Sequence, residues 1–173
     1  MREDRKERMM KRILGVFGIL LIVGFLVAPA YSATITLNGT IRDFNASHPD
    51  MESHIEYDPG IVQAGLGGDG NPVYAGQTGN PTTHGQTAFD QWYNDSPGVN
   101  MTGSHSITLD NTLTADPNVY RFSSNSFFPI DGLLFGNEGR SHNYHFTFEL
   151  NSEFTYQGDE VFSFTGDDDL WVF

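Results

Sequence analysis

The chain has 173 residues and carries 22 acidic against nine basic side chains, which gives a formal charge of −13 at pH 7. A protein this acidic is a poor partner for nucleic acid or for an anionic membrane surface, because both attract basic patches. The chain has no cysteine, which excludes disulfides, thiolate metal sites and a cysteine nucleophile. The acidity itself fits either cation binding or simple solubility, and both readings stay open at this point.

The first 32 residues have the three-part pattern of a secretory signal peptide. A basic head precedes an apolar run, Ile13 to Val27, and small residues then favour cleavage between Ser32 and Ala33. The run is 15 residues long, short of the ~20 that a membrane-spanning helix needs, so an uncleaved anchor is the second choice. We predict a signal peptide over residues 1–32 and a protein that is secreted or at the cell surface. The remaining chain, 33–173, has three basic and 19 acidic residues, a formal charge of −16.

The first element expected after the signal is a half-buried strand over Thr34 to Asp43. Apolar or small residues alternate there with polar ones, which is the period of a strand. The polar stretch 44–56 comes next, and Pro49 is expected to prevent a regular element within it. Residues 57–81 are rich in Gly, Asp, Asn and Pro, which predicts a long loop. A short helix is expected within Thr83 to Asp95, where Phe89, Trp92 and Tyr93 share one helical face and are interpreted as core residues.

From Ser104 onward the pattern predicts strands. Alternating apolar pairs occur in each of the expected strands, and these are Ile107 with Leu109, Tyr120 with Phe122, Tyr144 through Leu150, Phe154 with Tyr156, and Phe162 with Phe164. The last two pairs flank the turn 157–160 and predict a β-hairpin. Short alternating strands separated by turn residues indicate an all-β, antiparallel sandwich with long Gly/Asn/Asp loops and one short helix. The chain stops at Phe173 within an expected strand, so we expect it to be part of a longer protein.

The acidic triplet Asp167-Asp168-Asp169 lies between an aromatic strand and the apolar run 170–173. Carboxylates this close together repel one another, and a cation relieves that repulsion. Calcium is the natural candidate, because it takes ~6–8 oxygen ligands from carboxylates, carbonyls and water. A solvated acidic turn between two strands is the alternative. We predict a Ca²⁺ site at Asp167 and Asp168, with Asp169 as an additional candidate ligand.

The sequence gives little sign of an enzyme. His142 and His145 are three apart on a predicted strand, which points them to opposite faces. No zinc-protease, nucleophile-elbow or phosphate-loop motif occurs. The residues Asp167 to Asp169 are too close together in sequence to act as acid and base on opposite sides of a glycosidic bond. We therefore expect no catalytic residues and no enzymatic activity.

Most of residues 33–173 resembles the fibro-slime domain. The specific part is the C-terminal half, and short blocks nearer the N-terminus add to it. The segments that carry the resemblance are Phe128–Gly132, Phe135–Gly139, His142–Leu150, Glu153–Glu160 and Phe164–Phe173, with Thr36–Phe44 and Phe89–Tyr93 as the N-terminal blocks. We accordingly expect 33–173 to be a fibro-slime domain that is incomplete at its C-terminus.

The resemblance implies a fold and a function. Fibro-slime domains occur in secreted and surface proteins of bacteria and slime moulds, and their C-terminal part is similar to the jelly-roll-like, lectin-type β-sandwich of anthrax protective antigen. In sugar-binding members of that superfamily, two aspartates joined by a cis peptide hold a calcium that binds sugar hydroxyls. Asp167 and Asp168 match this pair, whereas Asp169 stands where glycine is common. The further ligands come from a later loop, beyond Phe173.

The resemblance thus implies a secreted or cell-surface adhesion module that binds carbohydrate with the help of calcium. The alternative is a structural domain of an extracellular matrix or slime that packs on other proteins without binding sugar. The expected partners are extracellular glycans or matrix proteins. Nucleic acid is not an expected partner, and the membrane is expected to be reached only through the signal or anchor segment.

Overall fold

The computed structural model describes residues 32–52, 56–77, 79–166 and 170–173. The chain divides into two units, residues 1–31 and 32–173, and all of the described residues belong to the second. Nearly all of the predicted signal peptide and the triplet Asp167–Asp169 lie outside the described residues. Within the described ranges, no helix is long and apolar enough to cross a membrane.

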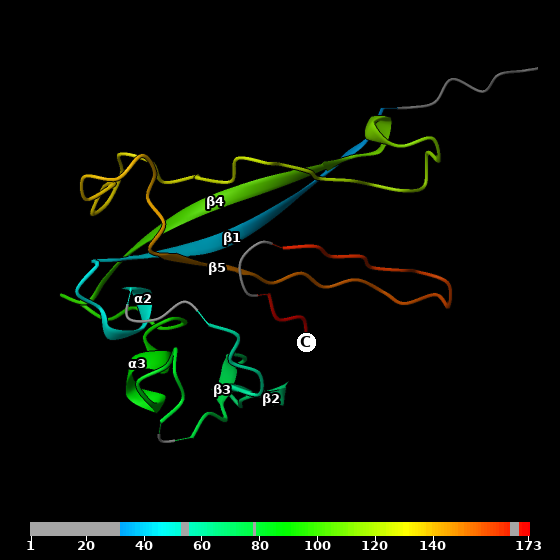
Figure 1. The fold of residues 1–173 in the computed structure, drawn as a ribbon. Coiled ribbons are helices and arrows are strands. Elements are labelled where there is room, and N and C mark those ends of the chain that lie inside the picture. Colours follow the sequence, from blue (N-terminus) through cyan, green and yellow to red (C-terminus); the bar gives the residue numbers. More distant parts are fainter. Residues whose placement is uncertain (1–31, 53–55, 78, 167–169) are drawn as a thin grey trace, which may run out of the picture. The chain divides into compact units, whose positions relative to one another are not determined.

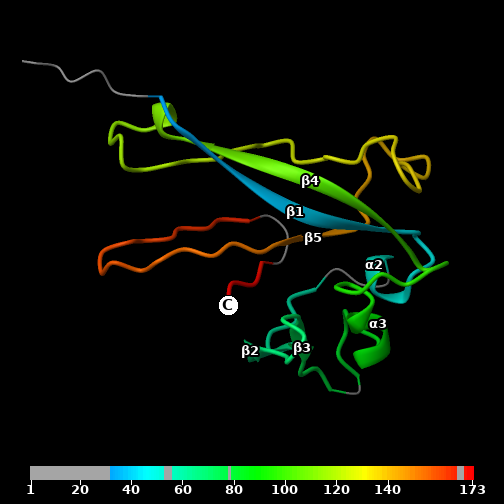
Figure 2. The same cartoon turned by 180° about the vertical axis from the view of Figure 1, so that it is seen from behind.

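Three antiparallel strands form the larger sheet. They are β1 (Thr34–Phe44), β4 (Asn100–Asp110) and β5 (Phe146–Leu150), in the order β4-β1-β5. β1 pairs along its whole length with β4, and its second half also pairs with β5, from Gly39 opposite Leu150 to Asp43 opposite Phe146. Figure 1 shows the two long strands side by side with β5 along β1, and Figure 2 shows the same order from behind. The protein is therefore rich in antiparallel sheet, as the sequence predicts.

β1 confirms the strand predicted from the alternation over Thr34 to Asp43. Its first half is a surface strand, with Ile35 41% exposed, whereas Ile41 and Phe44 at its far end are fully buried. The change results from the pairing, because only the second half has a neighbouring strand on both sides. The buried apolar residues gather around this end of β1 and around helix α3, and they are Ile41, Phe44, Ile61, Ala88, Phe89 and Ile130.

The stretch 57–81, which the sequence predicts as a long ordered or semi-ordered loop, contains short strands. It contains a second, two-stranded antiparallel sheet of β2 (Val62–Leu66) and β3 (Pro72–Tyr74). A tight connection joins the two strands, because the Gly67 N–H donates to the Asn71 carbonyl at 2.8 Å and the Gly70 N–H donates to the Gly67 carbonyl at 3.0 Å. Gly70 has φ +85°, which glycine adopts without strain. The sequence pattern thus predicts the turn but not the short strands on either side of it.

Two short α-helices and one 3₁₀ turn complete the regular structure of the described residues. The prediction that Pro49 prevents a regular element is wrong, because α2 (Pro49–Glu52) begins at that proline. Proline is well suited to the first turn of a helix, where its missing N–H has no intrahelical partner in any case. Helix α3 (Gln86–Asp90) confirms the helix expected within Thr83 to Asp95. The 3₁₀ turn η1 (Asn111–Leu113) comes directly after β4.

Three predicted strand regions are not strands in the structure, and the run 170–173 is one of them. Tyr120 and Phe122 flank an isolated bridge between Arg121 and Asp110 instead of a continuous strand. Residues 151–166 run out and back, as Figure 1 shows in orange and red, but no strand ladder joins the two arms. The alternation of Phe154, Tyr156, Phe162 and Phe164 predicts one buried face, whereas these side chains are 57–66% exposed. Without a layer to cover that face, the pattern alone does not form a sheet.

Candidate binding site

The predicted metal ligands Asp167, Asp168 and Asp169, with the peptide bond between the first two, lie outside the described residues. The structure does describe Trp171, whose ring centroid lies 6.2 Å from that of Trp92, just after α3. The segment next to the triplet is therefore in contact with the end of α3. Among the residues that the structure describes, no group of three or more His, Asp or Glu side chains is arranged to hold a metal ion.

Helix α3 is built around a cluster of aromatic rings. Phe89 is fully buried, and its ring centroid lies 5.0 Å from Trp92, 5.4 Å from Tyr93 and 5.2 Å from Tyr74 on β3. The predicted interpretation of Phe89 as a core residue is confirmed, whereas Trp92 and Tyr93 are only partly buried. The cluster fixes β3 against α3, since aromatic pairs at this separation stabilise beyond the area they bury.

A cavity of about 180 Å³ opens between the β2–β3 hairpin and α3. We call it the α3 pocket, and its lining residues are Asp69, Asn71, Pro72, Val73, Tyr74, Gln86, Asp90, Tyr93 and Asn94. Its lining combines carboxylates and amides with two phenol rings and an apolar Pro-Val pair. None of these residues was predicted as part of a site, because the sequence places them in a supposed loop and around a helix expected to be buried.

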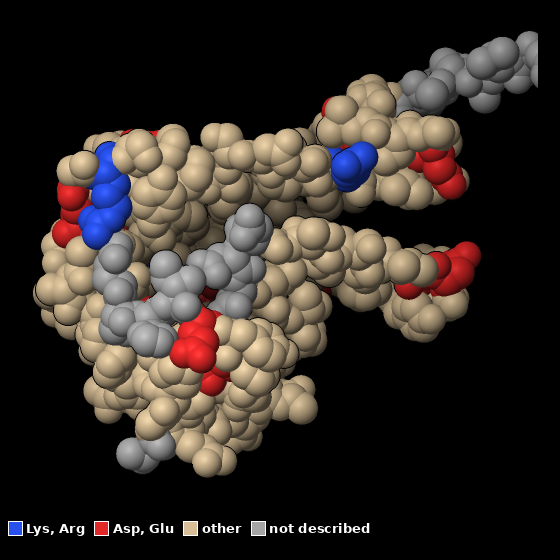
Figure 3. All heavy atoms as spheres, in the orientation of Figure 1, with Lys and Arg blue, Asp and Glu red and all other residues tan. Residues whose placement is uncertain are grey.

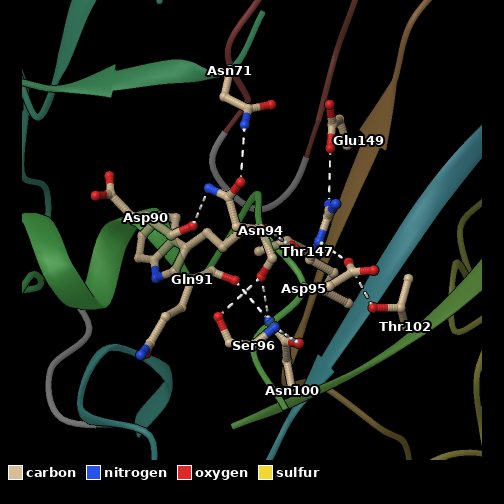
Figure 4. A network of polar contacts seen from close by, with 12 residues as sticks. Asn71, Asp90, Gln91, Asn94, Asp95, Ser96, Asn100, Thr102, Thr147 and Glu149 are labelled. Carbon is tan, nitrogen blue, oxygen red and sulfur yellow. Dashed lines mark hydrogen bonds and ion pairs between the residues drawn. The ribbon is translucent and has the colours of Figure 1, made fainter. Parts of the chain in front are cut away.

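Hydrogen bonds hold the walls of the α3 pocket together, as Figure 4 shows in part. The Asp69 carboxylate accepts from the backbone N–H of Asn71 at 3.1 Å and from its side-chain amide at 3.2 Å. The Asn71 amide also donates to the Asn94 side-chain oxygen at 3.4 Å, and the Asn94 amide donates to the Asp90 carbonyl at 2.8 Å. On the opposite wall the Tyr74 hydroxyl lies 2.9 Å from the hydroxyl of Thr83. The hairpin and the helix are therefore connected directly around the cavity.

The loop after α3 is fixed by the buried side chain of Asn100. Its amide donates to the carbonyls of Gln91 and Asn94, both at 2.9 Å, and its oxygen accepts from the Ser96 N–H at 2.9 Å (Figure 4). One asparagine at the start of β4 thus satisfies three backbone groups of that loop. This matters for the α3 pocket because Asn94, one of its lining residues, belongs to the same loop.

On its other side, α3 is tied to α2 through a buried carboxylate. The Asp50 side chain is fully buried and accepts from the His84 N–H and the His84 ring, both at 2.8 Å, and from the Trp92 indole at 3.2 Å. His48 lies beside it, and its Nδ1 accepts from the Asp50 N–H at 3.2 Å. Its Nε2 lies 3.0 Å from the Gln91 side-chain oxygen and donates to it. These histidines serve the packing of the helices.

Arg42 of β1 connects the three-stranded sheet to the α3 region. Its guanidinium pairs with Glu149 of β5 at 2.8 Å and with Asp95 at 3.1 Å, and Thr102 of β4 also donates to Asp95 at 2.8 Å. Figure 4 shows Glu149 and Thr102 near Asp95 of the loop after α3. On the face drawn in Figure 3, acidic side chains occur in several separate groups and basic ones in few places. An excess of negative charge disfavours anionic ligands.

The segment 128–145 is attached to β1 by buried and half-buried carboxylates. Asp43, fully buried, accepts from the Phe135 N–H at 2.7 Å and from the Asn143 amide at 2.9 Å. Burial raises the pKa of Asp43, and these two hydrogen bonds offset only part of that rise. The carboxylate of Glu138 accepts from the Ala46 N–H at 2.9 Å and lies 3.1 Å from the His145 ring.

His142 and His145 do not lie on one strand, contrary to the prediction. β5 begins only at Phe146, and both histidines precede it. The His142 ring stacks on Phe128 with centroids 3.8 Å apart and planes inclined by 6°, and its Nδ1 donates to Asp131 at 2.6 Å. Hydrogen bonds from the His142 ring and from the Asn143 N–H hold the pKa of Asp131 below its ordinary value. Each histidine has its own carboxylate partner, so the two do not form a common site.

The chain is similar to proteins of Dictyostelium discoideum. It is 40% identical to the protein psiD over 81% of this chain, 35% identical to psiR over 95% and 37% identical to psiQ over 90%. It spans 31% of the length of psiD, 18% of psiR and 17% of psiQ. No protein-family profile matches the chain, and no solved structure matches it at a significant level. Its sequence therefore resembles one part of several longer proteins.

Proposed function

We propose that this chain is a fibro-slime domain of a secreted or cell-surface protein, and that it binds carbohydrate on extracellular glycans with the help of calcium. Asp167 and Asp168 would hold the ion, with Asp169 as an additional ligand, and the domain would have the jelly-roll-like sandwich fold of the protective-antigen type. Residues 1–32 would direct export. The domain would act by binding, without catalysis.

The contact between Trp171 and Trp92 is the observation that carries this proposal. It brings the segment directly after the acidic triplet to the end of α3. Calcium with open coordination positions can exchange water for vicinal hydroxyls, which are hard, neutral oxygen ligands.

The similarity to Dictyostelium discoideum proteins supports the fibro-slime assignment, because slime moulds are one of the two groups in which that family is expected. The coverage is also consistent with a module, since this chain aligns over most of its own length with a fraction of each relative. The strong acidity of residues 33–173 favours a protein whose carboxylates are partly neutralised by extracellular cations.

Glycan-array binding of the full chain in calcium and in EDTA tests the proposal. We expect binding in calcium, loss of signal in EDTA, and loss in Asp168→Asn, which keeps the side-chain shape but removes a ligand charge. Asp159→Asn is the matched control, because it removes one exposed carboxylate elsewhere. Blank arrays for the wild-type chain in millimolar calcium would contradict the carbohydrate proposal, and unchanged binding by Asp168→Asn would contradict the calcium site.

A structural role in an extracellular matrix is the second candidate, and one observation favours it. Residues 151–166 expose a row of large apolar side chains, with Phe154, Tyr156, Val161, Phe162 and Phe164 between 57% and 88% exposed. Apolar side chains gathered in this way are typical of surfaces that pack on other proteins. Analytical ultracentrifugation distinguishes the two roles: concentration-dependent assembly of a protein with blank arrays would favour the matrix role.

A further inference from the structure

The α3 pocket combines apolar and polar side chains around one described cavity. Its volume of about 180 Å³ lies below the ~300–1,000 Å³ of pockets that take drug-sized molecules. A single six-membered sugar ring is therefore a better match for it than an oligosaccharide or a nucleotide. Two of its lining rings are held in place, because Tyr74 and Tyr93 both pack on the fully buried ring of Phe89.

The lining of the α3 pocket is partly apolar and partly polar. Pro72, Val73 and the rings of Tyr74 and Tyr93 offer apolar surface, whereas Asp69, Gln86 and Asp90 offer polar groups. The Asp90 carboxylate has no hydrogen-bond partner among the described residues, since it is the Asp90 backbone carbonyl that accepts from Asn94 (Figure 4). A ligand with both a C–H face and several hydroxyl donors can contact the apolar part with that face and hydrogen-bond the polar part with its hydroxyls.

The charges of the α3 pocket disfavour anionic ligands. Asp69 and Asp90 repel phosphate, sulfate and carboxylate groups, and the formal charge of −16 over residues 33–173 adds to that repulsion. A calcium ion needs ~6–8 oxygen ligands, whereas the carboxylate of Asp69 already accepts two hydrogen bonds from Asn71. Neutral ligands with many hydroxyl groups avoid this repulsion, and a small organic cation is the alternative that the titration below includes.

We propose that the α3 pocket binds one neutral pyranose residue, and that it does so without calcium. Asp90 and Gln86 hydrogen-bond the hydroxyls of the sugar, and the ring of Tyr74 or Tyr93 contacts its C–H face. The α3 pocket is a site separate from the predicted ion site at Asp167 and Asp168. The inference rests on the proposed function only in taking carbohydrate as the ligand class.

Titration of the purified full chain with single sugars in EDTA tests this inference. Glucose, galactose, mannose and N-acetylglucosamine are added one at a time and followed by saturation-transfer NMR. We expect at least one of them to bind with a millimolar Kd, and Asp90→Asn to weaken that binding at least tenfold. Gln86→Ala provides a second test at an exposed position, and near-ultraviolet circular dichroism verifies that each variant is folded. Asp159→Asn, far along the chain in the segment 151–166, should bind like the wild type.

Each outcome of the titration decides one question. Binding that persists in EDTA and in Asp168→Asn, and falls in Asp90→Asn, supports the α3 pocket even if the calcium-dependent array signal is absent. Array binding that needs calcium, together with no sugar response in EDTA, overturns the α3 pocket and leaves the proposed function intact. Wild-type sugar affinity in both Asp90→Asn and Gln86→Ala would also overturn the α3 pocket. So would a stronger response to Nα-acetyl-lysine amide, a small organic cation, or to Ca²⁺ alone than to any sugar.

Discussion

Asp43 is a charged residue in an unusual position, at the end of β1 with its side chain fully buried. Its carboxylate accepts from Phe135 and Asn143, and the nearby Glu138 makes its ionisation harder still. Burial is the main reason that its pKa is raised. The contribution of this group to stability is therefore complete below its unfolded pKa and is lost as the pH rises through its raised folded value.

We predict that the stability difference between the wild type and Asp43→Asn depends on pH. The asparagine has no charge to lose, so the free energy of unfolding of the wild type relative to the variant should be highest at the lowest pH and should fall as the pH rises. Any cost of fitting the asparagine amide against its donors is the same at each pH. Urea unfolding of both proteins between pH 3.5 and 7 measures the difference, and a difference that grows with pH would contradict the prediction.

Asp131 shows the opposite behaviour at the surface. The hydrogen bond from the His142 ring is the largest reason that its pKa is lowered, so its contribution is present above its unfolded pKa and is lost as the pH falls through the folded value. His142→Phe should raise the pKa of Asp131 toward its ordinary value while keeping a ring stacked on Phe128. Carbon-13 NMR titration of the Asp131 carboxyl measures this shift. An unchanged pKa in the variant would show that the histidine has no such effect.

Among the elements, the contact between β1 and β5 depends on a glycine. A Cβ added at Gly39 would lie 2.7 Å from the Glu149 carbonyl oxygen and would overlap the ring of Phe148. Since the carbonyl belongs to the backbone, it cannot move without breaking the pairing of the two strands. We predict that Gly39→Ala lowers the free energy of unfolding by about 1–3 kcal/mol, as overpacked sites do.

Gly65→Ala on β2 is the matched control, because nothing lies within 4 Å of its added Cβ. It should be neutral or slightly stabilising through the unfolded chain. Chemical denaturation of both variants against the wild type gives the comparison. Equal effects at the two glycines would show that the close approach of β5 is not what requires Gly39.

The success of sequence-based prediction differs between elements for a physical reason. β1 has a long alternating pattern and finds a neighbour along its full length, so its local pattern is sufficient. β4 begins at Asn100, four residues before the point from which the pattern predicts strands, because its first residues do not alternate. The alternation of Phe154 with Tyr156 is equally clear, but a ladder also needs a paired and covered neighbour, which the pattern does not supply. β2 and β3 are not predicted, because they have only five and three residues on either side of a glycine-rich turn. Strands this short do not show a recognisable alternation of apolar and polar residues.

At the scale of the whole molecule, the candidate site illustrates the same limit. The acidic triplet can be found because its three carboxylates are adjacent in sequence. The α3 pocket joins Asp69 and Asn71 of the hairpin to Asp90 and Asn94 of the helix region, and the packing of Tyr74 on Phe89 brings them together. No local period specifies that contact. The Asp-Gly-Asn turn between two short apolar segments is the only available signal, and it indicates a turn rather than a site.

Arg42 connects distant parts of the chain, and its removal should therefore affect the entire domain. It is 9% exposed and pairs with Glu149, 107 residues away, and with Asp95, 53 residues away. Arg42→Met should lower the free energy of unfolding by about 3 kcal/mol, because it leaves the largely buried Glu149 carboxylate without its partner. Arg42→Met combined with Glu149→Leu should recover a large part of the loss, since the uncompensated charge is then gone. Urea unfolding of the four proteins of this double-mutant cycle gives the coupling energy. Additive losses, with no recovery in the double variant, would show that Arg42 acts through its packing and not through its ion pair with Glu149.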